Sequence, residues 1–252
     1  MKVGDKDLRR IGLGTNRLIH TPENIAFIRD AVKAGVQMID TAHLYTGGES
    51  ELTIGEALSP FPEDVVVATK AGFGGAGRGR PDVLRSEIEE SFRRLRTETV
   101  ELCYLHRVDP ETPIEESLGA IKDYLDRGRI RHVGISEVTV EQIERARKVV
   151  PITAVQNHYN LAERKYDDVV DHCEREGIVF VPFYPLRAGG GPKVDSMARR
   201  HHATPHQVML AWLLRRSPVM LPIPGTLSRA HLKENLATSG VELTDQDFEA
   251  LR

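Results

Sequence analysis

The amino-acid sequence predicts a single (β/α)8 barrel, and three observations lead to this fold class. Short apolar runs alternate with amphipathic charged segments along all 252 residues. Eight of the runs are rich in Val, Ile and aromatic residues, and they are apolar throughout, as is typical of parallel strands buried on both faces. Eight strand–helix alternations over this length fit one closed barrel, and no linker divides residues 1–252.

The first predicted strand follows a hairpin that we expect to turn at Asp5-Lys6. The eight predicted strands are Arg10–Gly14, Gln37–Thr41, Val65–Lys70, Leu102–His106, His132–Ser136, Thr153–Asn157, Val179–Tyr184 and Val219–Pro224. A doubly wound open sheet stays open as an alternative, because periodicity does not reveal the order of the strands in the sheet.

Helical patterns fill the spaces between the strands, and several begin or end at a typical capping residue. Thr139, Thr204 and Thr244 are placed to cap helices at their first turns, and Gly35 and Gly177 to end them. The predicted helices are Pro22–Ala34, Arg85–Arg96, Ile114–Asp126, Val140–Val149, Tyr166–Glu176, Pro205–Arg215, Leu232–Ala237 and Asp245–Leu251.

The composition excludes several classes of protein. A formal charge of −3 argues against a nucleic-acid or membrane-surface protein, and 40% hydrophobic residues suffice for a sizeable core. Two cysteines do not make a disulfide framework, and the charged N-terminus is unlike a signal peptide. We therefore expect a soluble, cytoplasmic protein, a monomer or weak oligomer, that binds neither nucleic acid nor membranes.

Polar side chains stand at the ends of three successive predicted strands. Asp40 ends the second strand, with Tyr45 just beyond it, while Lys70 ends the third strand and His106 the fourth. The carboxyl ends of barrel strands share one face, and active sites of this fold lie there. We therefore expect these four side chains to form one catalytic site.

These residue types suit the reduction of a carbonyl group. Hydride addition leaves negative charge on the carbonyl oxygen, which then needs a proton. Because a free tyrosine has a pKa of about 10, we expect the Lys70 ammonium to stabilise the Tyr45 phenolate and lower that pKa. Asp40 would hold Lys70 as an ion pair, and His106 would hydrogen-bond the substrate oxygen.

Each of the four residues also has a purely structural interpretation. Asp40 could cap a helix, Tyr45 could pack in a loop, and Lys70 could be a surface lysine. His106 could be a core histidine. Their occurrence together at consecutive strand ends favours the catalytic interpretation.

The motifs around these residues resemble those of the aldo-keto reductases. They follow in the family's order along nearly the whole chain: Ile39-Asp40-Thr41-Ala42 with Tyr45, Ala68-Thr69-Lys70, Leu105-His106-Arg107, Val133-Gly134-Ile135-Ser136, Val155-Gln156-Asn157, Pro185-Leu186 and Pro222-Ile223-Pro224-Gly225-Thr226. The resemblance implies a (β/α)8 fold, reversible reduction of a small carbonyl substrate with tyrosine as general acid, and NAD(P)H bound without a Rossmann domain. The segments that follow His106 and Ser136 look most like bacterial pyridoxal-reductase-like members.

The resemblance also implies a cofactor site. Ser136 and Gln156 would hydrogen-bond the nicotinamide carboxamide, and Glu137 stands where the family often has asparagine. Phe183, or the adjacent Tyr184, would stack on the nicotinamide ring. The other implied contacts are Leu186 in a glycine-rich loop over the pyrophosphate, and Gly225, Thr226, His231, Glu234 and Asn235 near the adenosine.

We expect the enzyme to prefer NADP(H), with NAD(H) as the alternative. Many family members have a lysine and an arginine for the 2′-phosphate where this chain has Gly225 and His231. Arg229 or Lys233 could replace those cations, but either could equally be a solvated surface charge.

Two further patterns are weaker. The stretch Gly72–Gly77 matches G-x-G-x-x-G, but it continues into a loop rather than a helix, so we interpret it as the loop after the third strand. His201, His202 and His206 suggest a metal site, but we expect Arg199–Gln207 to be a surface helix and predict no metal.

Two functions from other classes compete with carbonyl reduction. A cofactor-sensing binding subunit could use the same barrel, although the intact set of four residues favours an enzyme. An aldolase could form a Schiff base at Lys70, but Asp40 beside it would keep that amine charged and unreactive.

Overall fold

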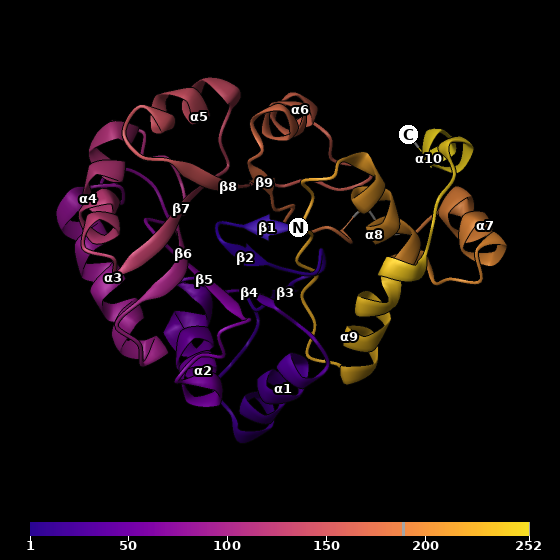
Figure 1. The fold of residues 1–252 in the computed structure, drawn as a ribbon, viewed down its shortest axis with the longest axis horizontal. Helices are drawn as coiled ribbons and strands as arrows, with labels where there is room; N and C mark the ends of the chain where they lie inside the picture. Colours follow the sequence, from indigo (N-terminus) through magenta and orange to yellow (C-terminus); the bar gives the residue numbers. More distant parts are fainter. Residues whose placement is uncertain (188–189, 252) are drawn as a thin grey trace.

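Parallel strands follow one another around the sheet in the order of the sequence, with helices outside them (Figure 1). The computed structural model describes residues 1–187 and 190–251. Within these residues the sheet runs β3 (Leu13–Gly14), β4 (Met38–Asp40), β5 (Val66–Ala71), β6 (Val100–Leu105), β7 (Ile130–Ser136), β8 (Ile152–Gln156) and β9 (Val179–Phe180).

The segment 219–225 closes the sheet into a barrel. Met220 bridges Phe180 of β9 on one side, and Gly225 bridges Gly14 of β3 on the other, both in parallel. This segment was predicted as a strand, but it forms no continuous ladder. Pro222 and Pro224 lack the N–H groups that a ladder requires. The closed, sequential order excludes the doubly wound alternative and confirms the (β/α)8 fold class.

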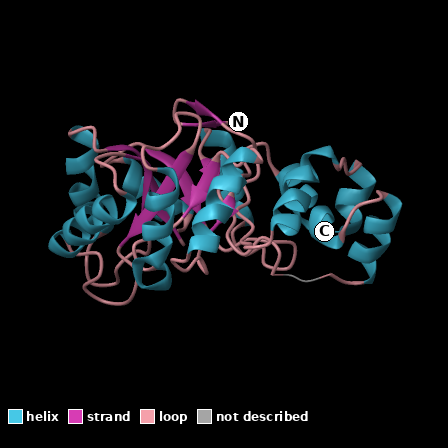
Figure 2. Cartoon of the chain, turned by 90° about the horizontal axis from the view of Figure 1, so that it is seen from below, coloured by secondary structure: helices cyan, strands magenta, loops and turns pink. Residues whose placement is uncertain are grey.

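A hairpin of β1 (Lys2–Val3) and β2 (Lys6–Asp7) lies at the end of the barrel where the strands begin (Figure 2). It turns at Gly4-Asp5, one residue earlier than predicted, because Gly4 adopts a positive φ of 61°. Val3 and Leu8 are buried and join the apolar interior of the barrel, so the hairpin plugs that end.

The α-helices surround the sheet, and α7 and α10 lie beside α8 at the edge of the molecule (Figure 1). Their bounds are α1 (Pro22–Lys33), α2 (Glu49–Leu58), α3 (Pro81–Leu95), α4 (Ile114–Asp126), α5 (Val140–Arg147), α6 (Asp167–Glu176), α7 (Pro192–Arg200), α8 (Pro205–Arg216), α9 (Arg229–Leu236) and α10 (Asp245–Leu251). Short 3-10 turns occupy Tyr45–Gly48 and Ala237–Gly240. None of the described helices has the length and apolar character that crossing a bilayer requires.

The predicted caps are present. Thr139 and Thr204 form capping boxes with Gln142 and Gln207, and Thr244 accepts a hydrogen bond from the Asp247 N–H. Gly177 ends α6 with a φ of 66°, in the left-handed region that favours glycine.

Four parts of the helix prediction were wrong. Helices α2 and α7 were not predicted, and α3 begins at Pro81 rather than Arg85. The polar side chains of Ser50, Glu51 and Thr53 are buried in α2 beside Ile54 and Leu58, so polar residues interrupt the apolar stripe of this helix in the sequence. The predicted surface helix Arg199–Gln207 is instead the end of α7, a turn and the start of α8.

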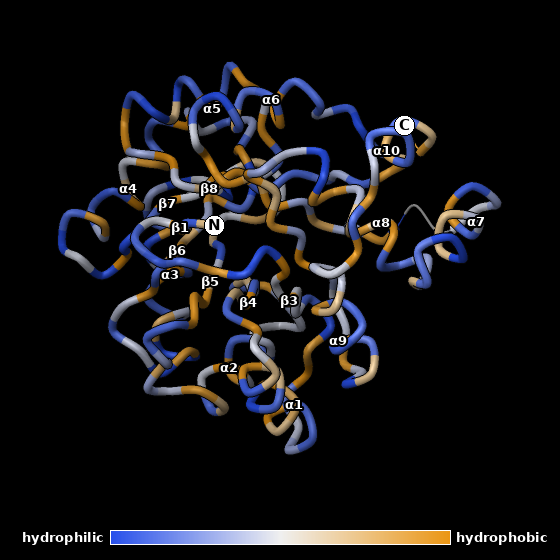
Figure 3. The backbone as a smooth tube through the Cα atoms, turned by 45° about the vertical axis from the view of Figure 1, so that its right-hand side comes forward, coloured by the Kyte–Doolittle hydropathy of each residue, from blue (hydrophilic) through white to orange (hydrophobic). Residues whose placement is uncertain are grey.

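Side chains alternate between two apolar cores along each strand. Val67 belongs to the layer between sheet and helices, whereas Val66 and Ala68 belong to the barrel interior. Figure 3 shows hydrophobic and hydrophilic stretches alternating along the chain. The interior row of each strand continues toward its carboxyl end, and this continuation positions the site described next.

Candidate active site

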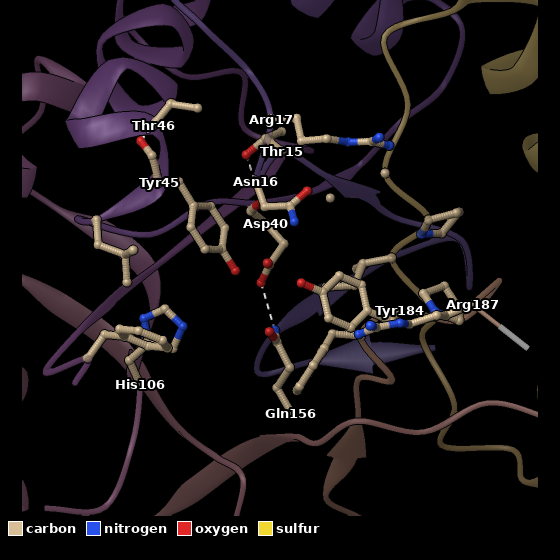
Figure 4. A pocket seen from close by; sticks show the side chains of 18 of the residues that line it. Thr15, Asn16, Arg17, Asp40, Tyr45, Thr46, His106, Gln156, Tyr184 and Arg187 are labelled. Carbon is tan, nitrogen blue, oxygen red and sulfur yellow. Dashed lines mark hydrogen bonds between the residues drawn. The ribbon is translucent and has the colours of Figure 1, made fainter. Parts of the chain in front are cut away.

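The candidate site continues the barrel's interior rows beyond their apolar residues. Met38 in β4 is followed two residues later by Asp40, and Ala68 in β5 by Lys70. Because strand side chains alternate with a period of two, a polar residue in such a row points into the barrel interior at the end where the strands finish. Gln156 ends the row of β8 in the same way (Figure 4).

Lys70 is the centre of a buried hydrogen-bond network. Its Nζ donates to Asp40 Oδ1 at 2.6 Å, to the Thr41 carbonyl at 2.7 Å and to the Tyr45 hydroxyl at 3.2 Å. These bonds use all three ammonium hydrogens. The Lys70 side chain is 0% exposed and that of Asp40 1%, so each charge depends on the other for compensation.

Asp40 is held from its other side as well. Gln156 Nε2 donates to Asp40 Oδ2 at 2.7 Å, and this bond is drawn in Figure 4. Burial by itself would lower the pKa of Lys70, but the charge of Asp40, the Tyr45 hydroxyl and the hydrogen bonds to both together outweigh burial and raise this pKa. Lys70 therefore stays charged at neutral pH.

Tyr45 differs in one respect from the expectation. Burial raises the pKa of the Tyr45 hydroxyl above its ordinary value, and the opposing charge of Lys70 offsets this only in part. The predicted net lowering was therefore wrong in direction, although Lys70 acts in the expected sense. The Tyr45 hydroxyl is protonated at neutral pH, as a proton donor must be.

His106 lies across from Tyr45 and is an uncharged group. The two rings are edge-on, with centroids 5.9 Å apart, and Phe73 packs on His106 at 4.7 Å. Burial, followed by the charges of Lys70 and Arg107, lowers the pKa of His106 to about 2. A neutral imidazole has one N–H group, so it can donate one hydrogen bond while it stays uncharged.

These residues open into a cavity of about 680 Å³. Tyr45 and His106 stand at one side of it, and Arg17, Tyr184 and Arg187 on the other (Figure 4). Phe73 lines the cavity in contact with the His106 ring. The other lining residues are Gly14, Thr15, Asn16, Asp40, Leu44, Thr46, Arg107, Gln156, Phe183, Pro185, Leu186, Ile223, Pro224 and Gly225.

Of the predicted cofactor residues, five line this cavity: Gln156, Phe183, Tyr184, Leu186 and Gly225. Phe183 already stacks on His158, with centroids 5.3 Å apart, whereas Tyr184 is 45% exposed. Leu18 and His158 are not among the lining residues.

Ser136 and Glu137 lie behind the cavity wall. Ser136 is buried, and its Oγ accepts a hydrogen bond from Arg107 Nη1 at 2.9 Å. Glu137 accepts the backbone N–H of His158 at 2.6 Å. Its φ of 57° is left-handed, a conformation that asparagine adopts more readily than glutamate. The Glu137 carboxylate therefore has a structural contact where we expected a cofactor contact.

Apart from Gly225, the residues predicted near the adenosine lie outside the cavity lining. Thr226 accepts the Ser228 N–H, and Glu234 accepts the Thr204 hydroxyl at 2.5 Å. Asn235 is buried in α9, and His231 is exposed on the same helix.

Two alternatives for the missing 2′-phosphate cations have different surroundings. Arg229 forms an ion pair with Asp30 at 2.7 Å, while Lys233 is exposed on α9. Of the predicted pyrophosphate loop, Gly189 lies outside the described residues, and Gly190 and Gly191 lead into α7.

Several lining residues were not predicted from the sequence. Asn16 follows β3 directly, and Leu44 and Thr46 flank Tyr45 after β4. The rule that barrel sites lie beyond the carboxyl ends of strands would have found all three. Arg187 lies in the loop after β9, and the same rule would have identified it.

The weaker patterns have structural explanations. Gly72–Gly77 lies in the loop that precedes α3, as predicted, and its Gly77 N–H donates to Asp109. His201 lies 2.9 Å from Asp247, whereas His206 lies 3.8 Å from Glu234, so the two histidines contact different carboxylates.

Fold and site together define a (β/α)8 enzyme whose reactive groups project from the carboxyl ends of its strands. Residues 10–195 and 190–252 match the aldo/keto reductase family. An uncharacterised oxidoreductase of Schizosaccharomyces pombe is 37% identical over 100% of this chain and 88% of its own length. Pyridoxine 4-dehydrogenase of Escherichia coli is 34% identical over 99% of this chain and 96% of its own.

A solved structure agrees with these relatives. An aldo/keto reductase from Klebsiella pneumoniae in complex with NADP and acetate superposes with a TM-score of 0.86 at 25% identity, covering 97% of this chain and 90% of that one. The chain belongs to the aldo/keto reductase family, and it is an NAD(P)H-dependent oxidoreductase.

Proposed function

We propose that this protein reduces an aldehyde or ketone to an alcohol, with Tyr45 as the proton donor, and that residues 1–252 act as one barrel domain. The observation that carries the proposal is the hydrogen bond from the buried Lys70 ammonium to the Tyr45 hydroxyl at the cavity wall. A charged donor held on a neutral phenol stabilises the phenolate that forms as the proton leaves.

The bound nicotinamide cofactor would supply the hydride to the carbonyl carbon. The cavity suits such a group, because two exposed arginines, Arg17 and Arg187, line it away from His106 and form no salt bridge within the described residues. Gly225 also leaves backbone uncovered in the cavity wall, where a Cβ would stand 3.3 Å from the Gly14 carbonyl oxygen. Cationic side chains and accessible backbone N–H groups are the groups that bind phosphates in proteins.

Side chains of the protein would supply the proton and orient the substrate. The Tyr45 hydroxyl donates its proton to the carbonyl oxygen, and Lys70 stabilises the phenolate left behind. Asp40 keeps Lys70 charged and in place, while Gln156 fixes Asp40. The neutral His106 ring faces the same space and orients the carbonyl by donating a hydrogen bond.

We propose NADP(H) as the preferred cofactor, with NAD(H) as the alternative. The similarity to a protein solved with NADP supports this preference, as do the two arginines without salt bridges. Measuring turnover and dissociation constants with NADPH and with NADH tests it, and a clear preference for NADH would contradict it.

The network disfavours an aldolase. Schiff-base chemistry needs an uncharged amine, but every hydrogen on Lys70 Nζ is engaged and the pKa of this lysine is raised. Borohydride treatment with a carbonyl substrate should leave Lys70 unlabelled, and covalent labelling there would support the aldolase instead.

The variant Tyr45→Phe tests the reductase directly. With a panel of aldehydes that includes pyridoxal, we expect turnover to fall about 10²- to 10⁴-fold, because the proton donor is missing. Cofactor affinity should persist, as measured by titration, since the ring remains. Tyr124→Phe is the matched control, because Tyr124 lies in α4, away from the cavity. Unchanged turnover in Tyr45→Phe would refute the mechanism.

A further inference from the structure

Arg107 lines the cavity next to His106 with part of its guanidinium unused. Its Nη1 donates to the His106 carbonyl at 2.6 Å and to Ser136 Oγ at 2.9 Å. A guanidinium has five N–H donors, of which Nη1 carries two. The remaining three, on Nε and Nη2, meet no acceptor among the residues that the structure describes.

No neighbouring carboxylate in the described part of the chain forms an ion pair with Arg107, although Glu137 lies close enough to act on its charge. Among residues 1–187 and 190–251, no acidic side chain forms a salt bridge with it. Asp40 is the carboxylate in the cavity lining, and Lys70 already neutralises it. Burial lowers the pKa of Arg107, which shows that the guanidinium has lost part of its hydration. A partly dehydrated cation gains most from an anionic ligand.

An apolar surface separates Arg107 from the reaction centre. The Phe73 ring lies 4.7 Å from the His106 ring and 5.2 Å from the Arg107 guanidinium carbon. Phe73 is 42% exposed, and Leu44 beside the same cavity is 38% exposed. A substrate that reaches from His106 to Arg107 would therefore place an apolar group over these side chains.

We propose that Arg107 is a specificity-determining residue that binds a carboxylate on the substrate. The preferred substrates are then aldehydes or ketones in which an apolar spacer, such as an aromatic ring, joins the carbonyl to a carboxylate. This inference rests on the proposed carbonyl reduction. The unused Nε and Nη2 edge presents two parallel donors, which match the two oxygens of a carboxylate.

A cofactor phosphate is a less suitable ligand for Arg107. Arg17 and Arg187 line the other side of the cavity from His106, and Figure 4 shows Arg187 beside Tyr184. Arg107 instead is anchored to the backbone of His106 itself, the residue that orients the carbonyl. Its free edge is thus fixed relative to the reacting carbonyl.

The test compares 4-carboxybenzaldehyde with its neutral analogue, methyl 4-formylbenzoate, at saturating cofactor. We expect the parent enzyme to favour the carboxylate in kcat/KM. Arg107→Met should lower kcat/KM for the carboxylate about 10- to 100-fold, mainly through KM, and change the ester less than about threefold. Arg107→Lys should keep part of the preference, because it keeps the charge but loses the two-donor edge.

Arg187→Met is the matched control, because it removes the same charge from the same cavity away from His106. We expect the ratio of the two kcat/KM values to be unchanged in this variant. An equal effect of Arg107→Met on both aldehydes, or a loss of cofactor affinity in that variant, would overturn the proposal and assign Arg107 to the cofactor. Circular dichroism and the Tm of each variant verify that it is folded.

A binding measurement separates this inference from the proposed function. Calorimetric titration of the two aldehydes with the NADP⁺-loaded protein should give about tenfold or greater weakening for 4-carboxybenzaldehyde in Arg107→Met, and none for the ester. If neither aldehyde is reduced, carbonyl reduction of this class fails while the carboxylate site is still judged by these affinities. Equal affinities for the two aldehydes in the parent protein would refute the site.

Discussion

Replacing Lys70 by methionine would remove a buried charge and leave its partner behind. Methionine fills a similar volume but donates no hydrogen bond. Asp40 would keep the bond from Gln156 Nε2, while the 2.6 Å contact with Lys70 would be lost. Since the Asp40 side chain is 1% exposed, water cannot replace the missing ammonium.

The size of the effect follows from this burial. Breaking one side of a buried ion pair typically costs about 3–5 kcal/mol. The stranded carboxylate can also take up a proton, which for a carboxyl group of ordinary acidity costs about 4 kcal/mol at pH 7 and about 1.5 kcal/mol at pH 5. We therefore expect Lys70→Met to lower the free energy of unfolding by about 3–4 kcal/mol at pH 7, and by less at pH 5.

The double variant Asp40→Asn with Lys70→Met is the control, because it removes both charges. Urea unfolding of both variants at pH 7 and pH 5 gives the free energies, and nicotinamide absorbance gives turnover. We expect the double variant to recover most of the stability lost by Lys70→Met, but not the activity, because nothing then stabilises the Tyr45 phenolate.

Three outcomes would refute this reasoning. A loss of less than about 1 kcal/mol in Lys70→Met would show that the pair is compensated by other groups. A loss that is the same at pH 7 and pH 5, or a double variant no more stable than the single one, would show that the cost is steric rather than electrostatic.

Two further predictions concern buried titratable groups. His106 has a pKa of about 2 in the folded protein, below the ordinary value of about 6.5, so the unfolded chain binds its proton first as the pH falls. Stability is therefore lost below about pH 6.5: between pH 7.5 and 5 the parent should lose about 2 kcal/mol more than His106→Gln in urea unfolding, and equal losses would contradict the buried neutral imidazole. Cys103 and Cys173 are buried with pKa values raised to about 12, so a chromogenic disulfide reagent should label neither in native protein and both in urea; prompt native labelling would contradict their burial.

The sequence alone predicted the barrel, and it singled out the four residues of the candidate site, which the structure brings together. Strand sterics impose a period of two, and apolar rows such as Val66 and Ala68 therefore lead directly to the polar residue that ends the row, Lys70. Helix caps at Thr139 and Thr204 are equally local, because a side chain and an N–H three residues apart make them.

Helix α2 shows where local patterns are insufficient. Its buried residues include Ser50, Glu51 and Thr53 beside Ile54 and Leu58, so polar side chains interrupt its apolar period. Hydrogen bonds from distant segments compensate the burial of these polar side chains. Thr15, for example, shares a hydrogen bond of 2.8 Å with Ser50. Gly55 is needed because α3 passes so close that a Cβ there would lie 2.3 Å from the Arg94 carbonyl oxygen.

The tertiary structure decided the electrostatics of the site. The net rise in the Tyr45 pKa comes from burial, and burial is a sum over many segments that no local pattern contains. The diversion of Glu137 to the His158 N–H and the anchoring of Arg107 on Ser136 likewise join residues from different strands and loops. Local backbone sterics thus determined which residues stand at the site, while long-range desolvation and hydrogen bonding determined their charge and their partners.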